Sequence, residues 1–216
     1  MLAIVVAKEP LPGRVKTRLC PPLDPVGAAE VAAAALADTL AAVAACGASR
    51  RVLALDGAPG ARLVVPTGFE VIPQRGDGLA ERLAAAWADA GEAGLQIGMD
   101  TPQVTPGLLD YALELLDGAV RAGDDVAALG RAADGGWWAI GLTRCAPEVF
   151  DGVPMSTPAT GAAQRERLVQ LGWRVVDLPV LRDIDRAADL AAVAAAAPGT
   201  ATAAVGRRLL GGGGLG

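Results

Sequence analysis

Residues that could do chemistry gather first near the amino terminus, in residues 7–19 (Ala-Lys-Glu-Pro-Leu-Pro-Gly-Arg-Val-Lys-Thr-Arg-Leu), which we call the opening loop. Glu9 is its only acid, and its basic residues are Lys8, Arg14, Lys16 and Arg18. Arginine can hold a phosphate through two parallel hydrogen bonds, and lysine supplies a compact positive charge. The loop follows residues 2–6, an apolar run typical of a strand buried on both faces. We therefore expect a phosphorylated ligand here, with a solvated basic loop as the alternative.

The opening loop matches neither of the two commonest nucleotide-binding patterns. It lacks the G-x-x-x-x-G-K-[ST] pattern of P-loop ATPases and the G-x-G-x-x-G pattern of dinucleotide dehydrogenases. Gly13 permits a tight turn and a close approach of the backbone to a ligand. Lys16 and Arg18 are candidate catalytic residues, because fixed positive charge stabilises the negative charge that develops on a transferred phosphoryl group.

Carboxylates follow two later segments that could face this loop. Asp100, in Gly98-Met-Asp-Thr-Pro102, comes directly after an apolar strand pattern and is well placed to bind Mg²⁺ that bridges phosphates. A turn or helix-capping role is the alternative for Asp100. Asp183 and Asp185 alternate in an extended segment, so their side chains should point the same way and need a cation or hydrogen-bond donors if buried. We favour Asp185 as the second metal ligand, because Asp100 needs a partner, with a helix N-cap as the alternative.

Two residue types limit the possible chemistry. The chain has no histidine, which excludes Ser-His-Asp and Cys-His nucleophile systems and any zinc site with histidine ligands. Its three cysteines are far apart and show no C-x-x-C pair, which is typical of reduced thiols. Any metal should therefore be a hard cation on carboxylate oxygens, and we expect Mg²⁺ or Mn²⁺.

Two further loops contain residues that could contact a ligand. In residues 132–138 (Ala-Ala-Asp-Gly-Gly-Trp-Trp), the paired glycines allow a close backbone approach and Asp134 could accept hydrogen bonds from sugar hydroxyls. The alternative is an Asp-Gly hairpin turn, after which one tryptophan faces the core and the other a cleft. Residues 74–82 (Gln-Arg-Gly-Asp-Gly-Leu-Ala-Glu-Arg) enter a helix, and Gln74 or the helix amides could read a nucleobase, unless the loop is merely solvated.

Composition bounds the class of protein. A chain of 216 residues suits one domain, and 52% apolar with only 3% aromatic residues predicts a core of small aliphatic side chains. A net charge of −5 argues against a nucleic-acid surface. We see neither a signal peptide nor a strongly apolar run long enough to span a bilayer. We therefore expect a cytoplasmic protein that binds no nucleic acid and no membrane, as a monomer or homodimer.

The expected elements alternate between strands and helices, which predicts an α/β domain with a mostly parallel mixed sheet flanked by helices. Strands are expected at residues 2–6, 51–55, 68–73, 95–98, 126–129, 137–142 and, as a last edge strand, 173–178. Helices are expected at residues 26–45, 78–90, 106–116 and 160–171, with a short turn at 147–150 and a final pair of Ala-rich helices from about 183. We assign residues 1–210 to this domain and 211–216 to a flexible Gly-rich tail. If the first strand neighbours strand 95–98 where the strand order reverses, the opening loop and Asp100 face each other.

These motifs together resemble a family of known proteins. The order of Gly13–Leu19, Gln74–Arg82, Gly98–Pro102, Asp134–Gly136 with Ile140–Leu142, Val153–Thr157 and Asp183–Asp185 is similar to that of the rSAM/selenodomain-associated transferases. These are small bacterial proteins of the nucleotide-diphospho-sugar transferase superfamily. Lys16-Thr-Arg-Leu19 is also similar to the Lys-Ser-Arg-Leu loop of 2-phospholactate guanylyltransferases. The resemblance implies a Rossmann-like GT-A fold.

The same resemblance implies roles for particular residues. Asp100 corresponds to the GT-A metal aspartate. The implied nucleotide-binding residues are Ala7, Lys8, Gly13, Arg14, Thr17, Gln74, Gly78 and Arg82. The implied acceptor- or sugar-binding residues are Asp134, Gly135, Gly136, Ser156 and Thr157. The chain departs from the family pattern around the acceptor pocket, with Met99 for a small polar residue, Met155 for a tryptophan, and Arg131-Ala132-Ala133 in place of a segment with a proline and an acid.

Three functions fit these observations. The first is metal-dependent transfer of a nucleoside monophosphate group from a triphosphate to a small phosphorylated acceptor, with release of pyrophosphate. The second is glycosyl transfer from a nucleotide-diphospho-sugar, and the third is nucleotide binding without catalysis. We favour the first, because four basic side chains in the opening loop exceed what a diphosphate donor requires.

Overall fold

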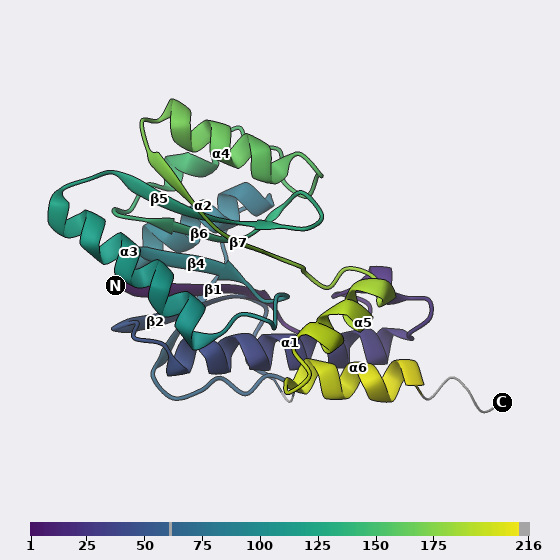
Figure 1. Cartoon of the computed structure of the whole chain (residues 1–216). Coiled ribbons are helices and arrows are strands. Elements are labelled where there is room, and N and C mark those ends of the chain that lie inside the picture. The colour runs from purple at the N-terminus through teal and green to yellow at the C-terminus, as the bar shows by residue number, and fades with distance from the viewer. Residues whose placement is uncertain (61, 212–216) are drawn as a thin grey trace.

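A computed structural model describes residues 1–60 and 62–211, and its centre is one seven-stranded sheet (Figure 1). The strands are β1 (Leu2–Lys8), β2 (Arg50–Asp56), β3 (Phe69–Pro73), β4 (Gly94–Gly98), β5 (Val126–Ala132), β6 (Trp137–Leu142) and β7 (Arg174–Leu181). Their order across the sheet is β3-β2-β1-β4-β6-β5-β7. β6 runs antiparallel to both of its neighbours, whereas the other pairs are parallel. The prediction of a mostly parallel mixed sheet, with its last strand at an edge, is confirmed.

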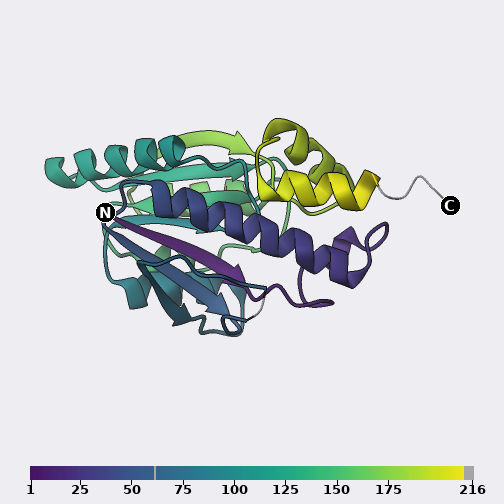
Figure 2. The same ribbon diagram turned by 90° about the horizontal axis from the view of Figure 1, so that it is seen from below.

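Helices cover both faces of this sheet. They are α1 (Pro25–Ala45), α2 (Leu79–Ala90), α3 (Pro106–Ala122), α4 (Thr160–Gln170), α5 (Ala187–Ala196) and α6 (Ala201–Gly211), with 3₁₀ turns η1 (Thr17–Leu19) and η2 (Pro147–Phe150). α1 and α3 pack on one face, and α2, η2 and α4 on the other. α5 and α6 lie along α1 beside the carboxyl edge of the sheet (Figures 1 and 2). α6 includes Gly211, and the rest of the predicted tail lies outside the described residues.

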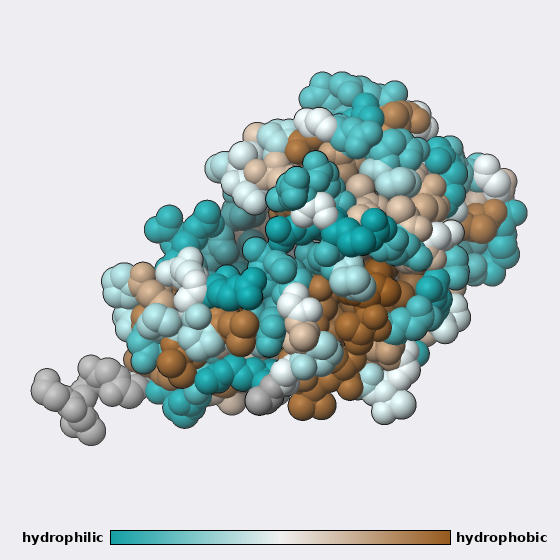
Figure 3. Space-filling model, turned by 180° about the vertical axis from the view of Figure 1, so that it is seen from behind, coloured by the Kyte–Doolittle hydropathy of each residue, from teal (hydrophilic) through white to brown (hydrophobic). Residues whose placement is uncertain are grey.

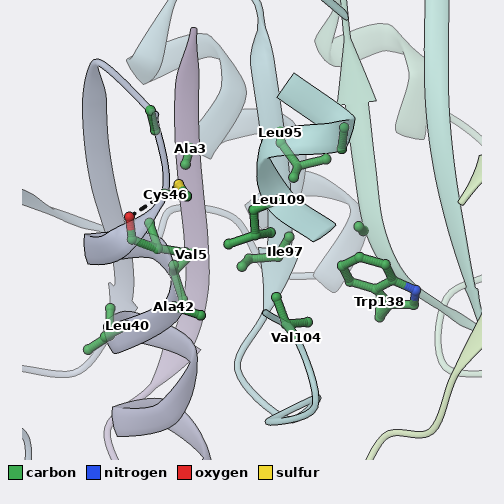
Figure 4. Close-up of a cluster of buried hydrophobic side chains, with 14 of the residues drawn as sticks. Ala3, Val5, Leu40, Ala42, Cys46, Leu95, Ile97, Val104, Leu109 and Trp138 are labelled. Atoms are coloured by element: carbon green, nitrogen blue, oxygen red, sulfur yellow. Dashed lines mark hydrogen bonds between the residues drawn. The ribbon is translucent and has the colours of Figure 1, made fainter. Parts of the chain in front are cut away.

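Small aliphatic side chains build the core, as the composition predicts. Ala3 and Val5 of β1 lie beside Leu95 and Ile97 of β4, and side chains of α1 and α3 close over them (Figure 4). Trp138 is the large side chain of this layer and is only 2% exposed. Burying one such aliphatic or aromatic side chain stabilises the fold by about 1.5–3 kcal/mol. Close packing of α1 on the sheet follows from its many alanines.

Capping residues set the ends of the two helices on this face. Asp24 Oδ1 accepts a hydrogen bond from the Gly27 amide at 2.7 Å, and Pro25 occupies the first turn of α1. Thr105 Oγ1 likewise accepts from the Leu108 amide at 3.2 Å before α3. Both caps are of the residue types preferred before a helix, and each is followed by proline in the first turn. α3 extends past the predicted end near residue 116 and stops only at Ala122, where the following glycine adopts a left-handed conformation.

α1 is long and apolar enough to cross a membrane by length and composition alone, so the expectation that the chain holds no such apolar run is wrong. However, 67% of its most apolar stretch is buried inside the protein. Such burial is the property of a core helix, because the same apolar residues already pack on the sheet and on α5 and α6.

The strand order reverses between β1 and β4. The chain adds β2 and β3 on one side of β1 and then returns to place β4 on the other, with Val6 opposite Gly98. The carboxyl ends of both strands therefore lie side by side, as the sequence analysis assumed. The opening loop leaves β1 and the segment with Asp100 leaves β4 at this point, where ligands of open α/β sheets commonly bind.

The hairpin between β5 and β6 packs tightly on the start of α4. Gly135 has a φ of +94°, which favours glycine, and its carbonyl accepts a hydrogen bond from the Gly161 amide at 2.8 Å. A Cβ atom added to Gly161 would lie 2.5 Å from the Gly136 carbonyl oxygen. Glycine at position 161 thus permits the contact that fixes the hairpin to the helix.

Substitution of this glycine tests the contact. We expect Gly161→Ala to lower the free energy of unfolding by about 1–3 kcal/mol, because backbone must move to accept the methyl group. Gly107 is a matched control, since it is also the second residue of a helix but has open space where a Cβ would lie. Gly107→Ala should leave stability unchanged or raise it by up to about 1 kcal/mol. Denaturant unfolding measures both, and equal effects would contradict the packing described.

Candidate functional site

A pocket of about 900 Å³ opens at the carboxyl edge of the sheet. Segments after β1, β4, β5 and β7 line it, together with the start of α2. In the space-filling view the molecule is hollowed near its centre, and hydrophilic residues surround much of the hollow (Figure 3). This pocket contains most of the residues that the sequence analysis selected.

Three carboxylates converge in the pocket. One oxygen atom each of Asp100, Asp183 and Asp185 lies within 4.8 Å of the others. The segment after β7 crosses the edge of the sheet to reach Asp100, whose carbonyl accepts a hydrogen bond from the Ile184 amide at 3.1 Å. The Ile184 side chain is fully buried against α1 and α5, so its two neighbours point the other way. We call Asp100, Asp183 and Asp185 the carboxylate cluster.

Two cations of the opening loop contact this cluster. Lys16 Nζ lies 2.7 Å from Asp100 Oδ2 and 3.4 Å from Asp185 Oδ1, and its side chain is only 10% exposed. Arg18 donates from its guanidinium to Asp185 Oδ2 at 2.8 Å, from a side chain that is 67% exposed. The loop and the cluster are therefore joined directly, across the reversal point between β1 and β4.

The cluster changes the protonation of its members. Burial, together with the negative charges of Asp100, Asp134 and Asp185, raises the pKa of Asp183 from 3.8 to about 6. Burial lowers the pKa of Lys16, but the charge of Asp100 and its hydrogen bond, with help from Asp185 and Asp183, more than offset that effect, so the Lys16 pKa is raised. Lys16 is thus held in its charged form, whereas burial and the neighbouring negative charges favour the protonated form of Asp183.

The donor set of the cluster fits a hard divalent cation. Carboxylate oxygens are the ligands that Mg²⁺ and Mn²⁺ prefer, and these three approach one another closely enough to share one ion. Burial first, and then the negative charges of neighbouring aspartates, raise the pKa of Asp183, so a cation beside it would stabilise its ionised form. Asp185 does not cap a helix, because α5 begins at Ala187 after Arg186 as N-cap residue.

The pocket brings most predicted binding residues together. Those that line it are Ala7, Lys8, Arg14, Lys16, Thr17, Arg18, Gln74, Asp100, Asp134, Gly136, Ser156, Thr157 and Asp185. Gly13, Gly78, Arg82 and Gly135 do not belong to its lining. Arg82 instead donates to Asp56 Oδ2 at 3.0 Å and to the Gly76 carbonyl, which folds the loop before α2 back on β2. Gly135 packs against Pro158.

The side-chain amide of Gln74 forms hydrogen bonds to the protein backbone. Its Nε2 atom donates to the carbonyls of Ala7 and Ala54 at 2.7 and 2.9 Å, which ties the end of β3 to β1 and β2. Only the side-chain carbonyl of Gln74 remains to accept a hydrogen bond from a ligand. Any reading of a base by Gln74 is therefore limited to a ligand donor group.

The loop between β5 and β6 forms the hairpin turn that the sequence analysis gave as an alternative. Asp134 Oδ1 accepts a hydrogen bond from the Gly136 amide at 2.7 Å, which stabilises the turn. Trp137 lines the pocket and Trp138 enters the core, so the predicted division between the two tryptophans is confirmed. Across the pocket mouth, the Thr157 amide donates to Thr160 Oγ1 at 3.0 Å, which orders the segment before α4.

Two residues gain importance that the sequence analysis did not give them. Asp183 completes the cluster, and its alternation with Asp185 was the available signal. Gln96, on the buried strand β4, lines the pocket floor, and its Oε1 atom has no hydrogen-bond partner among the described residues. Met99 also has a role, because it packs against Val15 of the opening loop over α1, where a small polar residue would leave that loop unsupported.

The fold matches those of several solved structures. A candidate nucleotide-diphospho-sugar transferase from Desulfovibrio desulfuricans G20 is 26% identical with a TM-score of 0.81, over 96% of this chain and 94% of that one. A CMP:2-keto-3-deoxy-manno-octonic acid synthetase complexed with CTP is 16% identical with a TM-score of 0.56, over 90% and 96%. Rv0371c from Mycobacterium tuberculosis H37Rv, in a complex with manganese, is 22% identical with a TM-score of 0.51, over 89% and 96%. The chain therefore has the GT-A-like fold of nucleotidyltransferases and nucleotide-sugar transferases.

Sequence comparison gives a narrower result. No curated protein matches this chain. The model of a family described as "Uncharacterized protein conserved in bacteria (DUF2064)" matches residues 39–157, which is more than half of the chain. That region includes β4 with Asp100 and the hairpin between β5 and β6. The chain thus belongs to the DUF2064 family.

Proposed function

We propose that this protein is a metal-dependent nucleotidyltransferase, which moves a nucleoside monophosphate group from a triphosphate to a small phosphorylated acceptor. The observation that carries the proposal is the contact between the basic opening loop and the carboxylate cluster at the reversal point of the sheet. The likeness of Lys16-Thr-Arg-Leu19 to the loop of 2-phospholactate guanylyltransferases supports it. The likeness to rSAM/selenodomain-associated transferases supports a transferase more generally.

In this reaction a phosphate oxygen of the acceptor attacks the α-phosphorus of the triphosphate. A new P–O bond forms, the bond from the α-phosphorus to the bridging oxygen of the β-phosphate breaks, and pyrophosphate leaves with both electrons of that bond. Such transfers need positioning and charge stabilisation more than covalent chemistry. The absence of histidine is compatible with that requirement.

Different residues of the pocket would bind the metal, the triphosphate and the acceptor. Asp100, Asp183 and Asp185 would hold Mg²⁺ or Mn²⁺, which when bound neutralises phosphate charge. Lys16 and Arg18 would contact the triphosphate, and Lys8 and Arg14 extend the same positive surface from the opening loop. Asp134, Ser156 and Thr157, on the far side of the pocket, would contact the acceptor.

Glycosyl transfer from a nucleotide-diphospho-sugar is the second candidate. The specific observation in its favour is the 0.81 TM-score to the candidate nucleotide-diphospho-sugar transferase, which covers nearly the whole chain. The same cluster would then hold the diphosphate leaving group, and Asp134 could accept hydrogen bonds from the transferred sugar.

Thermal stabilisation by nucleotides separates the two candidates. We expect an NTP with Mn²⁺ to raise the melting temperature, because a ligand at about 100 times its Kd adds about 2.7 kcal/mol to stability. Asp100→Asn should remove this response. Asp117→Asn, which changes a surface carboxylate of α3 paired with Arg121, should keep it. Pyrophosphate release in the presence of phosphorylated acceptors then reports turnover, and stabilisation by UDP- or GDP-sugars alone would favour the second candidate.

The repulsion inside the cluster gives a second prediction, measured with a chelator present. Because the folded-state pKa of Asp183 is raised to about 6, its ionisation lowers stability progressively as pH rises from about 4 to 6, and fully above that range. Asp183→Asn should therefore melt at a higher temperature than the wild type at about pH 8, with the difference shrinking toward pH 4. With Mn²⁺ the order should reverse, since the variant lacks one ligand. Equal melting curves at high pH would contradict the assigned repulsion.

A further inference from the structure

Lys16 contacts two of the three carboxylates that could hold a metal ion. Its ammonium lies 2.7 Å from Asp100 Oδ2 and 3.4 Å from Asp185 Oδ1, and these two residues are members of the cluster that could hold one ion. Mg²⁺ and Mn²⁺ approach carboxylate oxygens even more closely, at about 2.0–2.2 Å. Two positive groups cannot share these oxygens at contact distance without strong repulsion. A metal ion that used these two oxygens could enter only if Lys16 moved away from them.

Lysine is a rare residue in this chain, and one of its lysines contacts the cluster. Lys8 and Lys16 are the only lysines in a chain with 19 basic residues, and all the others are arginine. A guanidinium is broad and planar, whereas an ammonium is compact, flexible and similar in character to a small cation. Lys16 also has a φ of +48°, a left-handed conformation that is uncommon for a residue with a side chain, and this backbone aims the buried ammonium at the cluster.

We propose that the Lys16 ammonium takes the place of the metal and balances the negative charge of the carboxylate cluster until metal and triphosphate bind together. We call this the stand-in role of Lys16. This inference rests on the proposed function, because it takes the cluster as the metal site. When the metal enters, the displaced ammonium needs a new negative partner, and the phosphates of the incoming nucleotide supply it. Free metal therefore binds weakly, metal bound to triphosphate binds tightly, and each ligand raises the affinity for the other.

The proposal predicts that one variant binds free metal more tightly but binds metal with triphosphate more weakly. In Lys16→Met, which keeps the length of the side chain but removes its charge, free Mn²⁺ should bind at least about tenfold more tightly than in the wild type, because nothing must be displaced. The same variant should bind Mn²⁺ with inorganic triphosphate at least about tenfold more weakly, because the ammonium no longer meets the phosphates. Electron paramagnetic resonance of Mn²⁺ measures both affinities without any need for catalysis.

Matched controls separate this role from a general charge effect. Arg14 belongs to the same loop and lines the same pocket, but forms no ion pair in the part of the chain that the structure describes. Arg14→Met should therefore change the affinity for free Mn²⁺ by less than about twofold. Adding Asp100→Asn to Lys16→Met should abolish the gain. Circular dichroism and melting curves check that each variant is folded.

The stand-in role of Lys16 can also be tested in the wild-type protein, without any substitution. An amine-reactive label, quantified by peptide mass spectrometry against an added standard, reports the accessibility of Lys16 in each state. Lys8 is exposed but lines the same pocket, so it is followed separately and is not used as the reference. Lys16 should be protected with a chelator, become several-fold more reactive with Mn²⁺ alone at saturation, and be protected again when inorganic triphosphate is added.

The outcomes distinguish this inference from the function on which it rests. If Mn²⁺ binds the cluster with equal affinity in the wild type and Lys16→Met, and Lys16 stays protected, the stand-in role is wrong and the nucleotidyltransferase proposal stands. If neither protein binds Mn²⁺, even with triphosphate, both proposals fail. A gain for free Mn²⁺ with a loss for its triphosphate complex supports the coupling of the two ligands through Lys16.

Discussion

Like charges repel, and the fold of this protein brings three carboxylates within 4.8 Å of one another. Lys16 and Arg18 reach the same place from another strand end and offset part of this repulsion. β1 and β4 are adjacent through the reversal of strand order, so the loop that carries the cations faces Asp100. The attraction between this loop and the cluster therefore links the topology of the sheet to the chemistry of the pocket.

Apolar contacts outside the sheet hold the two charged segments in register. Leu19 of the opening loop and Ile184 of the segment after β7 are both fully buried in one cluster with α1 and α5. Each such side chain stabilises the fold by about 1.5–3 kcal/mol when buried. The charged neighbours of Leu19 and Ile184 are thereby fixed in place by hydrophobic packing, so their geometry does not depend on the ion pairs alone. The C-terminal helices are thus part of the site, although they contribute few residues to its lining.

Local patterns in the sequence were sufficient to predict much of this structure. The alternation of strand and helix patterns predicted these elements, and with them the strand ends that precede Lys16 and Asp100. The sequence could not show that Asp183 joins the cluster, because that depends on a crossing from edge strand β7 to β4. Nor could it show that the side-chain amide of Gln74 donates hydrogen bonds to two backbone carbonyls. These contacts join residues far apart in the chain, and no local spacing encodes them.

The ion pairs of the opening loop bear on which ligand this loop can hold. Four basic residues in the loop favour a triphosphate over a diphosphate only if their charges are available to the ligand. Two of them, Lys16 and Arg18, form ion pairs with carboxylates of the cluster. A divalent cation in the cluster would balance the same carboxylates and return both side chains to the pocket. If the cluster holds a metal as proposed, the positive charge offered to phosphates would depend on that metal, and the preference for a triphosphate would apply to the protein with metal bound.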